Sequence, residues 1–268
     1  MTTTATPASL IADAELHSLG TILDLTGKTV LITGAGSGIG RTLALGLARM
    51  GMNVAAVGRR TELLTELEIE ADAAGLSIIG VVADVTDGSQ IDAAVATTVE
   101  RFGALHCAVA NAGIAAVEPA IDMAEDAFRS VMDTNVVGVF NTARAAARAM
   151  SDGGSMVLTS SSFAKRGFDL WAPYNASKAA VSMLTETLAS EWAGSGIRVN
   201  AIAPTATLTD VNAELFDDPE FAAGVIAGIP AGRILAPAEL LLPTAFLLSS
   251  RNAMLLGHTL YVDGGQSL

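Results

Sequence analysis

The chain of 268 residues is long enough for one large α/β domain or two small ones, and its composition already excludes several functions. Hydrophobic residues make up 51%, so a large core is expected, and the formal net charge is −13. Such a charge argues against nucleic acid and against an anionic membrane as partners. No uncharged apolar run reaches the roughly 18 residues that a membrane helix requires.

The rare residue types point to a reducing compartment and away from metal chemistry. Cys107 is the one cysteine, which excludes an intrachain disulfide and is consistent with a cytoplasmic protein. It stands in an apolar run and is expected to be a buried structural thiol. The first basic residue is Lys28, so the charged n-region of a signal peptide is not expected. The three histidines are scattered without ligand spacing, and no metal site is expected.

Short apolar runs alternate with longer helical patterns along the chain. Seven strands are predicted, at residues 28–33, 53–57, 77–83, 105–110, 156–159, 197–203 and 259–262. Helices are predicted at residues 41–50, 61–74, 90–102, 125–133, 135–150, 173–193 and 237–249. Thr61 is the expected cap of its helix, and Pro243 is expected to bend the last one. The segment 205–233 is predicted to be irregular to helical.

A glycine-rich turn joins the first strand to the helix that follows it. Gly34, Gly38 and Gly40 have the spacing G-x-x-x-G-x-G, which differs from both G-x-G-x-x-G and the P-loop. Glycines let the backbone approach a ligand, and the following helix offers N–H groups and the positive end of its dipole. The turn therefore predicts a phosphate cradle. The alternative is a strand-to-helix turn that binds no ligand.

The alternation of strands and helices predicts one α/β domain with a doubly wound, Rossmann-like parallel sheet and helices on both faces. After residue 25 no linker, repeat or low-complexity tract divides the chain, so the domain is expected to span residues 25–268, with a lid region at 205–233. Residues 1–24 are expected to form a loose N-terminal arm that docks on the body or on a neighbouring subunit. In such sheets, ligands bind beyond the carboxyl ends of the strands.

Tyr174 and Lys178 form the pair on which the predicted chemistry depends. They stand four residues apart in a predicted helix, so the phenol and the ammonium project from one helical face. A neighbouring cation lowers the pKa of a tyrosine, and a shift from about 10 to about 7 requires roughly 4 kcal/mol. The pair would then suit proton exchange between a carbonyl and an alcohol. A surface lysine beside a core tyrosine is the alternative.

Together the motifs resemble the classical short-chain dehydrogenase/reductase family over roughly residues 25–266. The motifs that carry the resemblance are Thr33-Gly34-x-x-x-Gly38-Ile39-Gly40, Asp84, Asn111-Ala112-Gly113, Asn135, Ser161, Tyr174-x-x-x-Lys178, Asn200 and Pro204. There are two departures. Thr205 stands where the family usually has glycine, and Ala110 replaces the first of two asparagines. The loss of that glycine is expected to stiffen the loop beside the nicotinamide or to alter the substrate opening.

The resemblance implies catalytic roles for Asn135, Ser161, Tyr174 and Lys178. Tyr174 would be the general acid in carbonyl reduction and the base in alcohol oxidation. Lys178 would lower its pKa and hold the nicotinamide ribose, while Ser161 would donate a hydrogen bond to the substrate oxygen. Asn135 would hold a water in a proton relay behind the lysine. The alternatives are a polar strand cap for Ser161, whose neighbours on both sides are also serines, and a helix cap for Asn135.

The resemblance also implies a dinucleotide cofactor site. Its expected residues are Gly34, Ser37, Gly38, Ile39, Gly40, Arg59, Asp84, Val85, Asn111, Ala112, Gly113, Tyr174, Lys178, Pro204 and Thr209. Within this set Asp84 would contact the adenine, and Thr209 would hold the carboxamide. A simple turn cap is the alternative for Asp84.

The end of the second strand favours NADP(H) over NAD(H). NAD enzymes place an acidic residue there, which binds the adenosine ribose 2′-hydroxyl. Gly58 occupies this position, and Arg59 and Arg60 follow it. A guanidinium can hold a 2′-phosphate through two parallel hydrogen bonds, and Arg59 is the better candidate. The alternative is that Arg60 begins a helix and faces solvent, with Glu62 close enough to compete.

Two functions are open on this basis. The first is an NAD(P)-dependent oxidoreductase that interconverts a carbonyl and a secondary alcohol. The second is a catalytically inactive NAD(P)-binding regulator on the same fold. The resemblance also implies a homotetramer, with residues 143–150 and 179–188, rich in Ala, Met and Leu, packed between subunits. Burial of these stretches against the protein's own sheet is the alternative.

The partner is expected to be a small carbonyl or alcohol substrate. Residues 23–28 and 229–233 resemble those of sugar-acid and polyol dehydrogenases, and equally those of 3-oxoacyl-carrier-protein reductases. The loop 163–171 is expected to line the pocket. Its three aromatic residues suit an apolar or ring substrate, whereas Lys165 and Arg166 suit a carboxylate or phosphate. A solvated loop is the alternative for these two cations.

Overall fold

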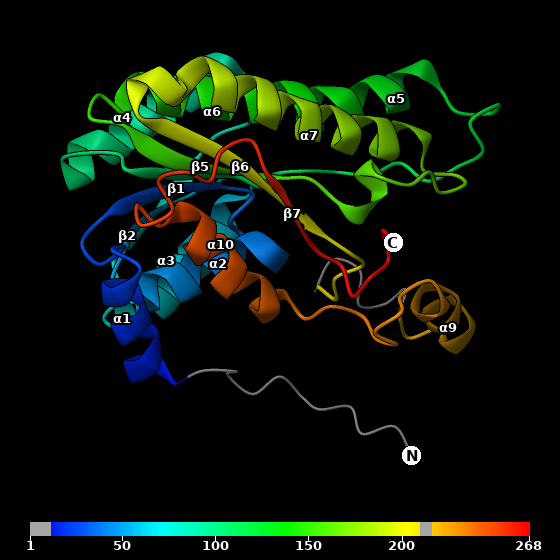
Figure 1. The fold of residues 1–268 in the computed structure, drawn as a ribbon, viewed down its shortest axis with the longest axis horizontal. Helices are drawn as coiled ribbons and strands as arrows, with labels where there is room; N and C mark the ends of the chain where they lie inside the picture. The colour runs from blue at the N-terminus through cyan, green and yellow to red at the C-terminus, as the bar shows by residue number, and fades with distance from the viewer. Residues whose placement is uncertain (1–11, 210–215) are drawn as a thin grey trace.

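The computed structural model describes residues 12–209 and 216–268, and its centre is one parallel sheet (Figure 1). In the described ranges the sheet has seven strands, in the order β3-β2-β1-β4-β5-β6-β7. They are β1 (Thr29–Thr33), β2 (Asn53–Gly58), β3 (Ile78–Val82), β4 (Cys107–Ala110), β5 (Gly154–Thr159), β6 (Ile197–Pro204) and β7 (Thr259–Val262). The doubly wound, Rossmann-like prediction is confirmed. The strand order reverses between β1 and β4, where such sheets open a ligand crevice.

Helices cover both faces of this sheet. One face carries α1 (Asp13–Ile22), α2 (Gly38–Arg49), α3 (Thr61–Ala73) and α10 (Leu241–Leu248) (Figure 1). The other carries α4 (Gly88–Phe102), α5 (Glu125–Met132), α6 (Gly138–Ala149) and α7 (Ala172–Trp192). A further helix, α9 (Pro219–Ala227), lies apart from both layers on the side of the C-terminus.

Successive residues of the central strands belong to two different cores. Val30 and Ile32 of β1 pack with residues of α2, α3 and α10, whereas Leu31 packs with residues of α4, α6 and α7. All three side chains are fully buried. Because successive side chains of a strand point to opposite faces, a strand covered on both faces must be apolar throughout. This is why the strands read as continuous apolar runs.

Three local details differ from the predicted elements. Thr61 is the first residue of α3, and Arg60 is its N-cap, without a side-chain hydrogen bond. A π-helical turn at Asp133–Val137 joins α5 to α6 where a break was expected. Pro243 lies in the first turn of α10, after a 3₁₀ turn at Pro237–Leu240. Its missing N–H costs no helical hydrogen bond there, so it does not have to bend the helix.

The N-terminal helix α1 packs on α2. Leu16 is buried, and a Cβ on Gly20 would lie 1.9 Å from the carbonyl oxygen of Met50. Leu25, beyond the end of α1, is also fully buried. The part of the predicted arm from residue 12 onward therefore docks on the body of its own chain. Residues 1–11 of that arm, and residues 210–215 of the predicted lid, lie outside the described residues.

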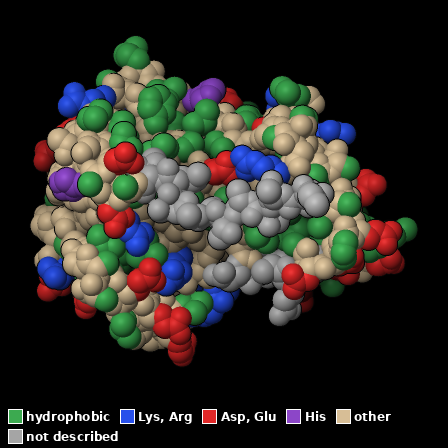
Figure 2. All heavy atoms as spheres, turned by 90° about the horizontal axis from the view of Figure 1, so that it is seen from below, with side chains coloured by type: hydrophobic (Ala, Val, Ile, Leu, Met, Phe, Trp, Pro, Cys, Tyr) green, Lys and Arg blue, Asp and Glu red, His purple; other side chains and the backbone are tan. Residues whose placement is uncertain are grey.

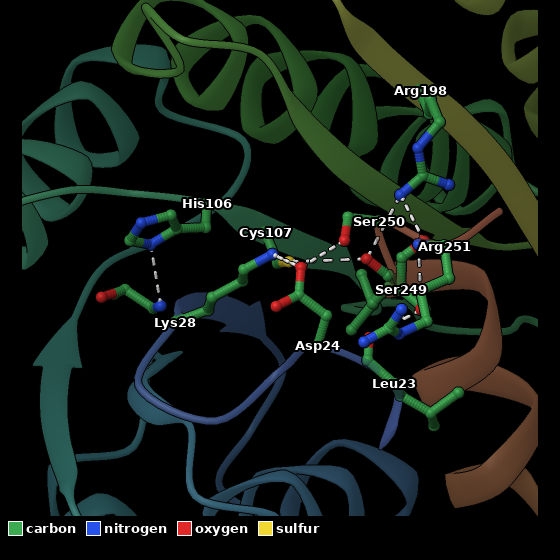
Figure 3. A network of polar contacts seen from close by, with 11 residues as sticks. Leu23, Asp24, Lys28, His106, Cys107, Arg198, Ser249, Ser250 and Arg251 are labelled. Carbon is green, nitrogen blue, oxygen red and sulfur yellow. Dashed lines mark hydrogen bonds and ion pairs between the residues drawn. The ribbon is translucent and has the colours of Figure 1, made fainter. Parts of the chain in front are cut away.

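At the amino ends of the strands, a polar network ties the start of the domain to the segment after α10 (Figure 3). The Lys28 ammonium pairs with Asp24 at 2.6 Å, and the Ser250 hydroxyl donates to the same carboxylate. The Ser249 hydroxyl donates to the carbonyl of Leu23 at 2.6 Å. The network thus joins segments that stand 226 residues apart in the chain.

Arg198, near the start of β6, is a buried cation at this same edge (Figure 3). Its guanidinium donates to the carbonyl oxygens of Leu247, Leu248, Ser249 and Asn252 at 2.8 to 3.3 Å. The last carbonyls of a helix have no partner within the helix, and they form the negative end of its dipole. Arg198 therefore satisfies the end of α10 and holds that helix against the sheet.

No helix within residues 12–209 and 216–268 is long and apolar enough to cross a membrane. On the face shown in Figure 2, Lys and Arg side chains are scattered among acidic and hydrophobic ones. Nucleic-acid binding uses a continuous basic surface, which this mixed face does not provide.

Candidate active site

The glycine-rich turn between β1 and α2 brings three backbone segments into close contact. Gly34 has a φ of +68°, and a Cβ there would lie 2.9 Å from the Cα of Ala112. A Cβ on Gly40 would lie 2.2 Å from the carbonyl oxygen of Gly34. At Gly38, whose φ is +53°, a Cβ would lie 3.1 Å from Cγ2 of Thr209. Side chains at these positions would fill the turn, and Thr209 lies directly beside it.

The first turn of α2 fits the pyrophosphate of a dinucleotide. Ser37 is the N-cap of this helix, but its side chain makes no capping hydrogen bond to the first-turn N–H groups. Such N–H groups, together with the positive end of the helix dipole, bind phosphate. Ile39, in the same turn, packs on the core beneath α2 and anchors it. The open glycine turn and these N–H groups thus suit the cofactor that the sequence predicted.

The two arginines after β2 make different contacts. Nη2 of Arg60 donates to Oγ of Ser37 at 2.8 Å, which holds this guanidinium against the glycine-rich turn. Arg59 pairs with Asp84 at 3.5 Å, and its side chain is 64% exposed. Arg60 is therefore the arginine in contact with the phosphate cradle, although the sequence had favoured Arg59. Arg60 is exposed and is also the N-cap of α3, as the alternative expected, and among the described residues its side chain is hydrogen-bonded to Ser37.

Asp84 and Val85 follow β3 and line the adenine side of the predicted site. Oδ1 of Asp84 accepts hydrogen bonds from the backbone N–H and the hydroxyl of Thr86, at 2.9 and 2.8 Å, which is the arrangement of a turn cap. Burial raises the pKa of Asp84, but the bonds from Thr86 and the nearby Arg59 outweigh it, and the pKa is lowered. The Val85 carbonyl accepts from Nδ2 of Asn141 at 3.0 Å, which fixes this segment to α6.

Thr33, at the end of β1, organises the segment after β4. Its hydroxyl accepts from the N–H groups of Asn111 and Ala112 at 3.1 and 3.2 Å, and Nδ2 of Asn111 donates to the Thr33 carbonyl at 3.1 Å. A Cβ on Gly113 would lie 3.2 Å from Oδ1 of Asn135 and 3.6 Å from Nζ of Lys178. The segment therefore runs from the glycine-rich turn to the predicted catalytic residues.

Tyr174, Lys178 and Ser161 meet where β5 and β6 end and α7 begins. Lys178 is buried, with its Nζ 5.5 Å from the centre of the Tyr174 ring, and it donates to the Thr159 carbonyl at 2.7 Å. The side chain of Ser161 lies close enough to that of Tyr174 to lower the pKa of the phenol. The Ser161 hydroxyl also lies 3.4 Å from the carbonyl oxygen of Pro204. The structure thus brings together four of the predicted site residues.

The two serines beside Ser161 are engaged elsewhere. The Ser160 hydroxyl is bonded to the Lys178 carbonyl at 3.0 Å and to the Ser182 hydroxyl at 2.8 Å, both on α7. The Ser162 hydroxyl donates to the side chain of residue 266 at 2.7 Å. Of the three serines, Ser161 is therefore the one that contacts Tyr174.

Burial dominates the proton affinities of the tyrosine–lysine pair. It raises the pKa of Tyr174, and the hydrogen bond with Ser161 acts in the opposite direction. Burial lowers the pKa of Lys178 to about 8, so the amine is still mostly protonated at neutral pH. The sequence had predicted a pKa for Tyr174 near neutrality. The net shift is opposite, because withdrawing a phenolate from water costs more than the neighbouring groups provide.

Asn135 is fully buried in the π-helical turn between α5 and α6. Its Oδ1 accepts from the N–H of Ile114 at 2.8 Å, and its Nδ2 donates to the Ile114 carbonyl at 2.9 Å and to the Ser177 hydroxyl at 3.0 Å. The side chain thereby fastens the segment after β4 to α7. Turns of this kind are frequent at functional sites. Both N–H donors of the amide are engaged, so a water held by Asn135 would donate to the second lone pair of Oδ1 or to the main-chain carbonyl.

An aromatic cluster supports Tyr174 from the loop before α7. Phe163 stacks on Phe168 with ring centres 4.0 Å apart, and it meets Trp171 edge-on at 5.3 Å. The Tyr174 ring contacts Phe163 at 5.8 Å and Trp171 at 5.5 Å, both in edge geometry. Such contacts fix the orientation of the phenol ring.

The two cations of the same loop are exposed and rest on aromatic faces. The ammonium of Lys165 lies 5.4 Å from the centre of the Tyr261 ring on β7. The guanidinium of Arg166 lies 5.7 Å from the centre of the Phe168 ring. Cation–π contacts of this kind are weak at exposed positions, so both groups stay available to an anionic ligand.

Comparisons with known proteins show the family to which the chain belongs. A family model described as enoyl-(acyl carrier protein) reductase matches residues 34–267. The 3β-hydroxysteroid dehydrogenase 1 of Eggerthella lenta is 39% identical over 249 residues, which are 91% of this chain and 95% of the relative. The chain belongs to the short-chain dehydrogenase/reductase family. As a member, it is an NAD(P)-dependent oxidoreductase that acts on CH–OH groups.

Other members of the family that resemble this chain act on different compounds. An A-factor type γ-butyrolactone 1′-reductase of Streptomyces virginiae is 41% identical over 90% of this chain and 96% of the relative. The solved structure of a gluconate 5-dehydrogenase from Burkholderia cenocepacia, in complex with NADP and tartrate, has a TM-score of 0.87 and 36% identity, and covers 92% of this chain and 98% of that chain. The names of these relatives cover a steroid, a butyrolactone and a sugar acid, so the family does not define the substrate.

One buried contact at the back of the site was missed by sequence reasoning. Oε1 of Gln266 accepts from the hydroxyls of both Ser162 and Thr205, each at 2.7 Å. All three side chains are buried. Thr205 replaces the glycine that the family usually has, and its hydroxyl finds its partner in this contact. The threonine in place of the usual glycine at position 205 was the one hint in the sequence, but no local pattern connects it to residue 266.

Proposed function

We propose that the protein interconverts a carbonyl and a secondary alcohol with NADP(H), and that Tyr174 exchanges the proton. The observation that carries the proposal is the contact of Tyr174 with both Ser161 and Lys178 at the carboxyl edge of the sheet. The cofactor, when bound, supplies or accepts the hydride. The oxygen that gains charge then needs one transferable proton and one fixed hydrogen-bond donor.

In carbonyl reduction, the Tyr174 hydroxyl donates its proton to the substrate oxygen. Burial raises its pKa and so keeps the phenol protonated, which is the state that a general acid requires. The Ser161 hydroxyl, whose contact with Pro204 is long at 3.4 Å, turns to donate to the same oxygen. The Lys178 ammonium stabilises the tyrosinate that remains. In alcohol oxidation, the tyrosinate accepts the proton.

The proton lost by Tyr174 returns through the side of Lys178 that faces Asn135. Gly113 separates these two residues only narrowly, since a Cβ there would lie within 3.6 Å of both side chains. The amide of Asn135 makes hydrogen bonds to Ile114 and Ser177, so it positions the turn. The water of the predicted relay would bind to the free lone pair of the Asn135 Oδ1 or to its main-chain carbonyl.

The preference for NADP(H) is supported by the two arginines after β2 and by the lack of a carboxylate at Gly58. Arg60 and Ser37 would hold the 2′-phosphate together, and Arg59 would add charge from the Asp84 side. We expect Arg60→Ala to lower kcat/KM with NADPH about tenfold, the cost of one charge-assisted hydrogen bond, and to leave NADH unaffected. Arg59→Ala should have a smaller effect. Equal or better use of NADH by the wild type, unchanged in both variants, would refute the preference.

The substrate is proposed to be a sugar acid or polyol, or a 3-oxoacyl thioester. Both classes are compatible with a loop that places aromatic rings beside Tyr174 and exposed cations at Lys165 and Arg166. A sugar acid would use the cations for its carboxylate, and an acyl thioester would use the rings for its chain. A panel of sugar acids, polyols and acetoacetyl thioesters with NADPH or NADP⁺ separates the two.

The same panel tests the enzyme against a cofactor-binding regulator. Turnover that is lost in Tyr174→Phe supports the proposal. A wild-type protein that quenches NADPH fluorescence but converts no carbonyl or alcohol in the panel would favour the regulator. The presence of Ser161, Tyr174 and Lys178 together supports an enzymatic function, because a regulator needs none of the three residues to bind phosphate.

Assembly into a homotetramer is proposed on the outer face of α6 and α7. A pocket there is lined by Val136, Val137, Phe140, Ala180, Met183, Leu184 and Thr187. These side chains are uncharged, so two copies can meet there without the repulsion expected from a net charge of −13. Residues 143–150 contribute less than expected, because their alanines at 143, 145 and 146 are buried in their own chain. Light scattering that finds a monomer at micromolar concentration would refute the assembly.

A further inference from the structure

The loops that carry Ser161 and Pro204 are joined at the back of the site by the segment after β7. Oε1 of Gln266 accepts from Ser162, next to Ser161, and from Thr205, next to Pro204, each at 2.7 Å. An amide oxygen has two lone pairs, so these two hydroxyls saturate it. The solvent-accessible fractions of Ser162, Thr205 and Gln266 are 0%, 7% and 5%. The three side chains thus form a buried, three-segment junction.

The turn before Gln266 is built to present that side chain inward. The Asp263 carboxylate accepts from the N–H groups of Gly265 and Ser267, both at 2.9 Å. Gly264 and Gly265 have φ values of +60° and +88°, which only glycine adopts without strain. The N–H of Ala231 donates to the Gly264 carbonyl at 2.9 Å, so the turn is also tied to the segment after α9.

The Ser161 and Pro204 loops also share a direct hydrogen bond, and the proposed reaction would break it. In the structure, the Ser161 hydroxyl reaches the Pro204 carbonyl at 3.4 Å. Under the proposed function, that hydroxyl must leave Pro204 to bind the substrate oxygen. The contact through Gln266 does not involve the reacting atoms, so it persists while the direct link is broken.

We infer that Gln266, with Thr205 and Ser162, is a positioning clamp that keeps Ser161 at the correct distance from the Pro204 loop during turnover. The inference rests on the proposed function and extends it. It also gives Thr205 a reason to stand where a glycine is usual, because a glycine has no hydroxyl to donate to Gln266. A shift of a reacting group by about 1 Å can cost up to about a hundredfold in rate, so loosening this clamp should be visible in kcat.

The test compares substitutions that remove a clamp hydrogen bond with one that keeps it. Thr205→Val and Gln266→Met remove the bond with little change in volume, whereas Thr205→Ser keeps the hydroxyl. We expect Thr205→Val and Gln266→Met each to lower kcat about tenfold, with KM and the dissociation constant for NADPH within about twofold of wild type. Thr205→Ser should keep most of the wild-type kcat. Equal kcat losses in the serine and valine variants, or no loss in either, would overturn the clamp.

A matched control separates positioning from general stability. Ser155 is the second residue of β5, the strand that ends before Ser161, and its buried hydroxyl donates to the Leu247 carbonyl at 3.0 Å. Ser155→Ala removes a comparable buried hydrogen bond at the opposite edge of the sheet. It should lower the melting temperature as much as Ser162→Ala does but leave kcat within about twofold. A kcat loss in Ser155→Ala as large as in Ser162→Ala would mean that the clamp acts only through stability.

Amide hydrogen exchange gives a readout that does not depend on activity. A clamp predicts that Thr205→Val accelerates exchange in residues 160–164 as well as in its own loop, because both loops share Gln266. Faster exchange confined to the substituted loop would refute the junction. If the wild type converts no substrate, the proposed function fails while this exchange result still decides the clamp.

Discussion

Polar side chains gather at both edges of the sheet, but their hydrogen bonds differ. At the amino edge, the Arg198 guanidinium donates hydrogen bonds to four carbonyl groups, and Lys28 forms an ion pair with Asp24 (Figure 3). At the carboxyl edge, Lys178 has three N–H donors and, among the described residues, one acceptor, the Thr159 carbonyl. The two cations at the amino edge are paired within the chain, whereas Lys178 at the carboxyl edge keeps N–H donors that a ligand can use.

The difference suggests that stability and catalysis are divided between the edges. Polar groups that are satisfied within the chain contribute to the free energy of unfolding when they are buried. Groups held near one another but left with spare hydrogen-bonding capacity contribute to a bound ligand instead. A change at one edge should therefore alter one property and leave the other nearly constant.

Tyr174→Phe should give the largest effect at the carboxyl edge. The ring keeps its contacts with Phe163 and Trp171, but the transferable proton is gone. We expect kcat/KM to fall at least about a hundredfold, the lower range for loss of a general acid. The free energy of unfolding should change by less than about 1 kcal/mol, and NADPH binding should persist. Steady-state kinetics and urea denaturation measure both; activity within a few-fold of wild type would contradict the assignment of Tyr174.

Arg198→Met should give the opposite result at the amino edge. It leaves the last carbonyls of α10 buried without their donor, so the free energy of unfolding should fall by about 3 kcal/mol. The kcat per folded molecule should stay within about twofold of wild type. Arg148→Met is the control, because Arg148 is 65% exposed and lies 4.0 Å from Asp92, and it should cost less than about 0.5 kcal/mol. Equal losses in the two variants would show that the carbonyl contacts carry no stability.

Ser161→Ala should shift the pH dependence of alcohol oxidation. The hydrogen bond from Ser161 lowers the pKa of Tyr174 against the effect of burial. Oxidation needs the tyrosinate, so its rate rises as pH passes through that pKa. Without the hydroxyl the pKa is higher, and the midpoint of the pH–rate profile should move to higher pH, in addition to a loss in kcat. A midpoint that stays in place or moves to lower pH would contradict the contact.

His106 should contribute a smaller pH dependence at the amino edge, in stability alone. Burial, and then the charge of Lys28, lowers its pKa from the ordinary 6.5, and its Nδ1 accepts from the N–H of Thr29 at 3.0 Å. The unfolded chain therefore binds a proton before the folded one does as pH falls. Stability is fully present above pH 6.5 and is lost as pH falls through the lowered value. In His106→Gln, urea midpoints at pH 7.5 and 5.5 should differ less than in wild type, with kcat unchanged; an undiminished difference would assign the effect to other groups.

The sequence predicted what depends on local pattern. Apolar runs located the strands, because a strand buried on both faces must be apolar. Glycines revealed the turn at Gly34, because close backbone approach excludes other residues. Helix periodicity predicted that Tyr174 and Lys178 project from one face, because they stand four residues apart. Each of these constraints acts within a few residues, so each is visible without the fold.

Contacts between distant segments could not be predicted in this way. Gln266 meets Ser162 and Thr205 only because three strands end side by side. The contact of Arg60 with Ser37 depends on how the start of α3 lies against the glycine-rich turn. The pKa of Tyr174 was predicted with the wrong sign, because the burial that controls it is a property of the packed cluster. The contacts of Asn135 with Ile114 and Ser177 likewise join segments that lie far apart in the chain.

The placement of the two tryptophans gives the protein a built-in optical probe. Trp171 is the N-cap of α7 and touches the Tyr174 ring, whereas Trp192 is the last residue of the same helix. A helix of 21 residues is about 30 Å long, so the two indoles report on separate environments. Because the chain has no other tryptophan, Trp192→Phe would leave a single tryptophan, at the active site. Reduced nicotinamide absorbs indole emission, so cofactor arrival could be timed by energy transfer on the unlabelled protein.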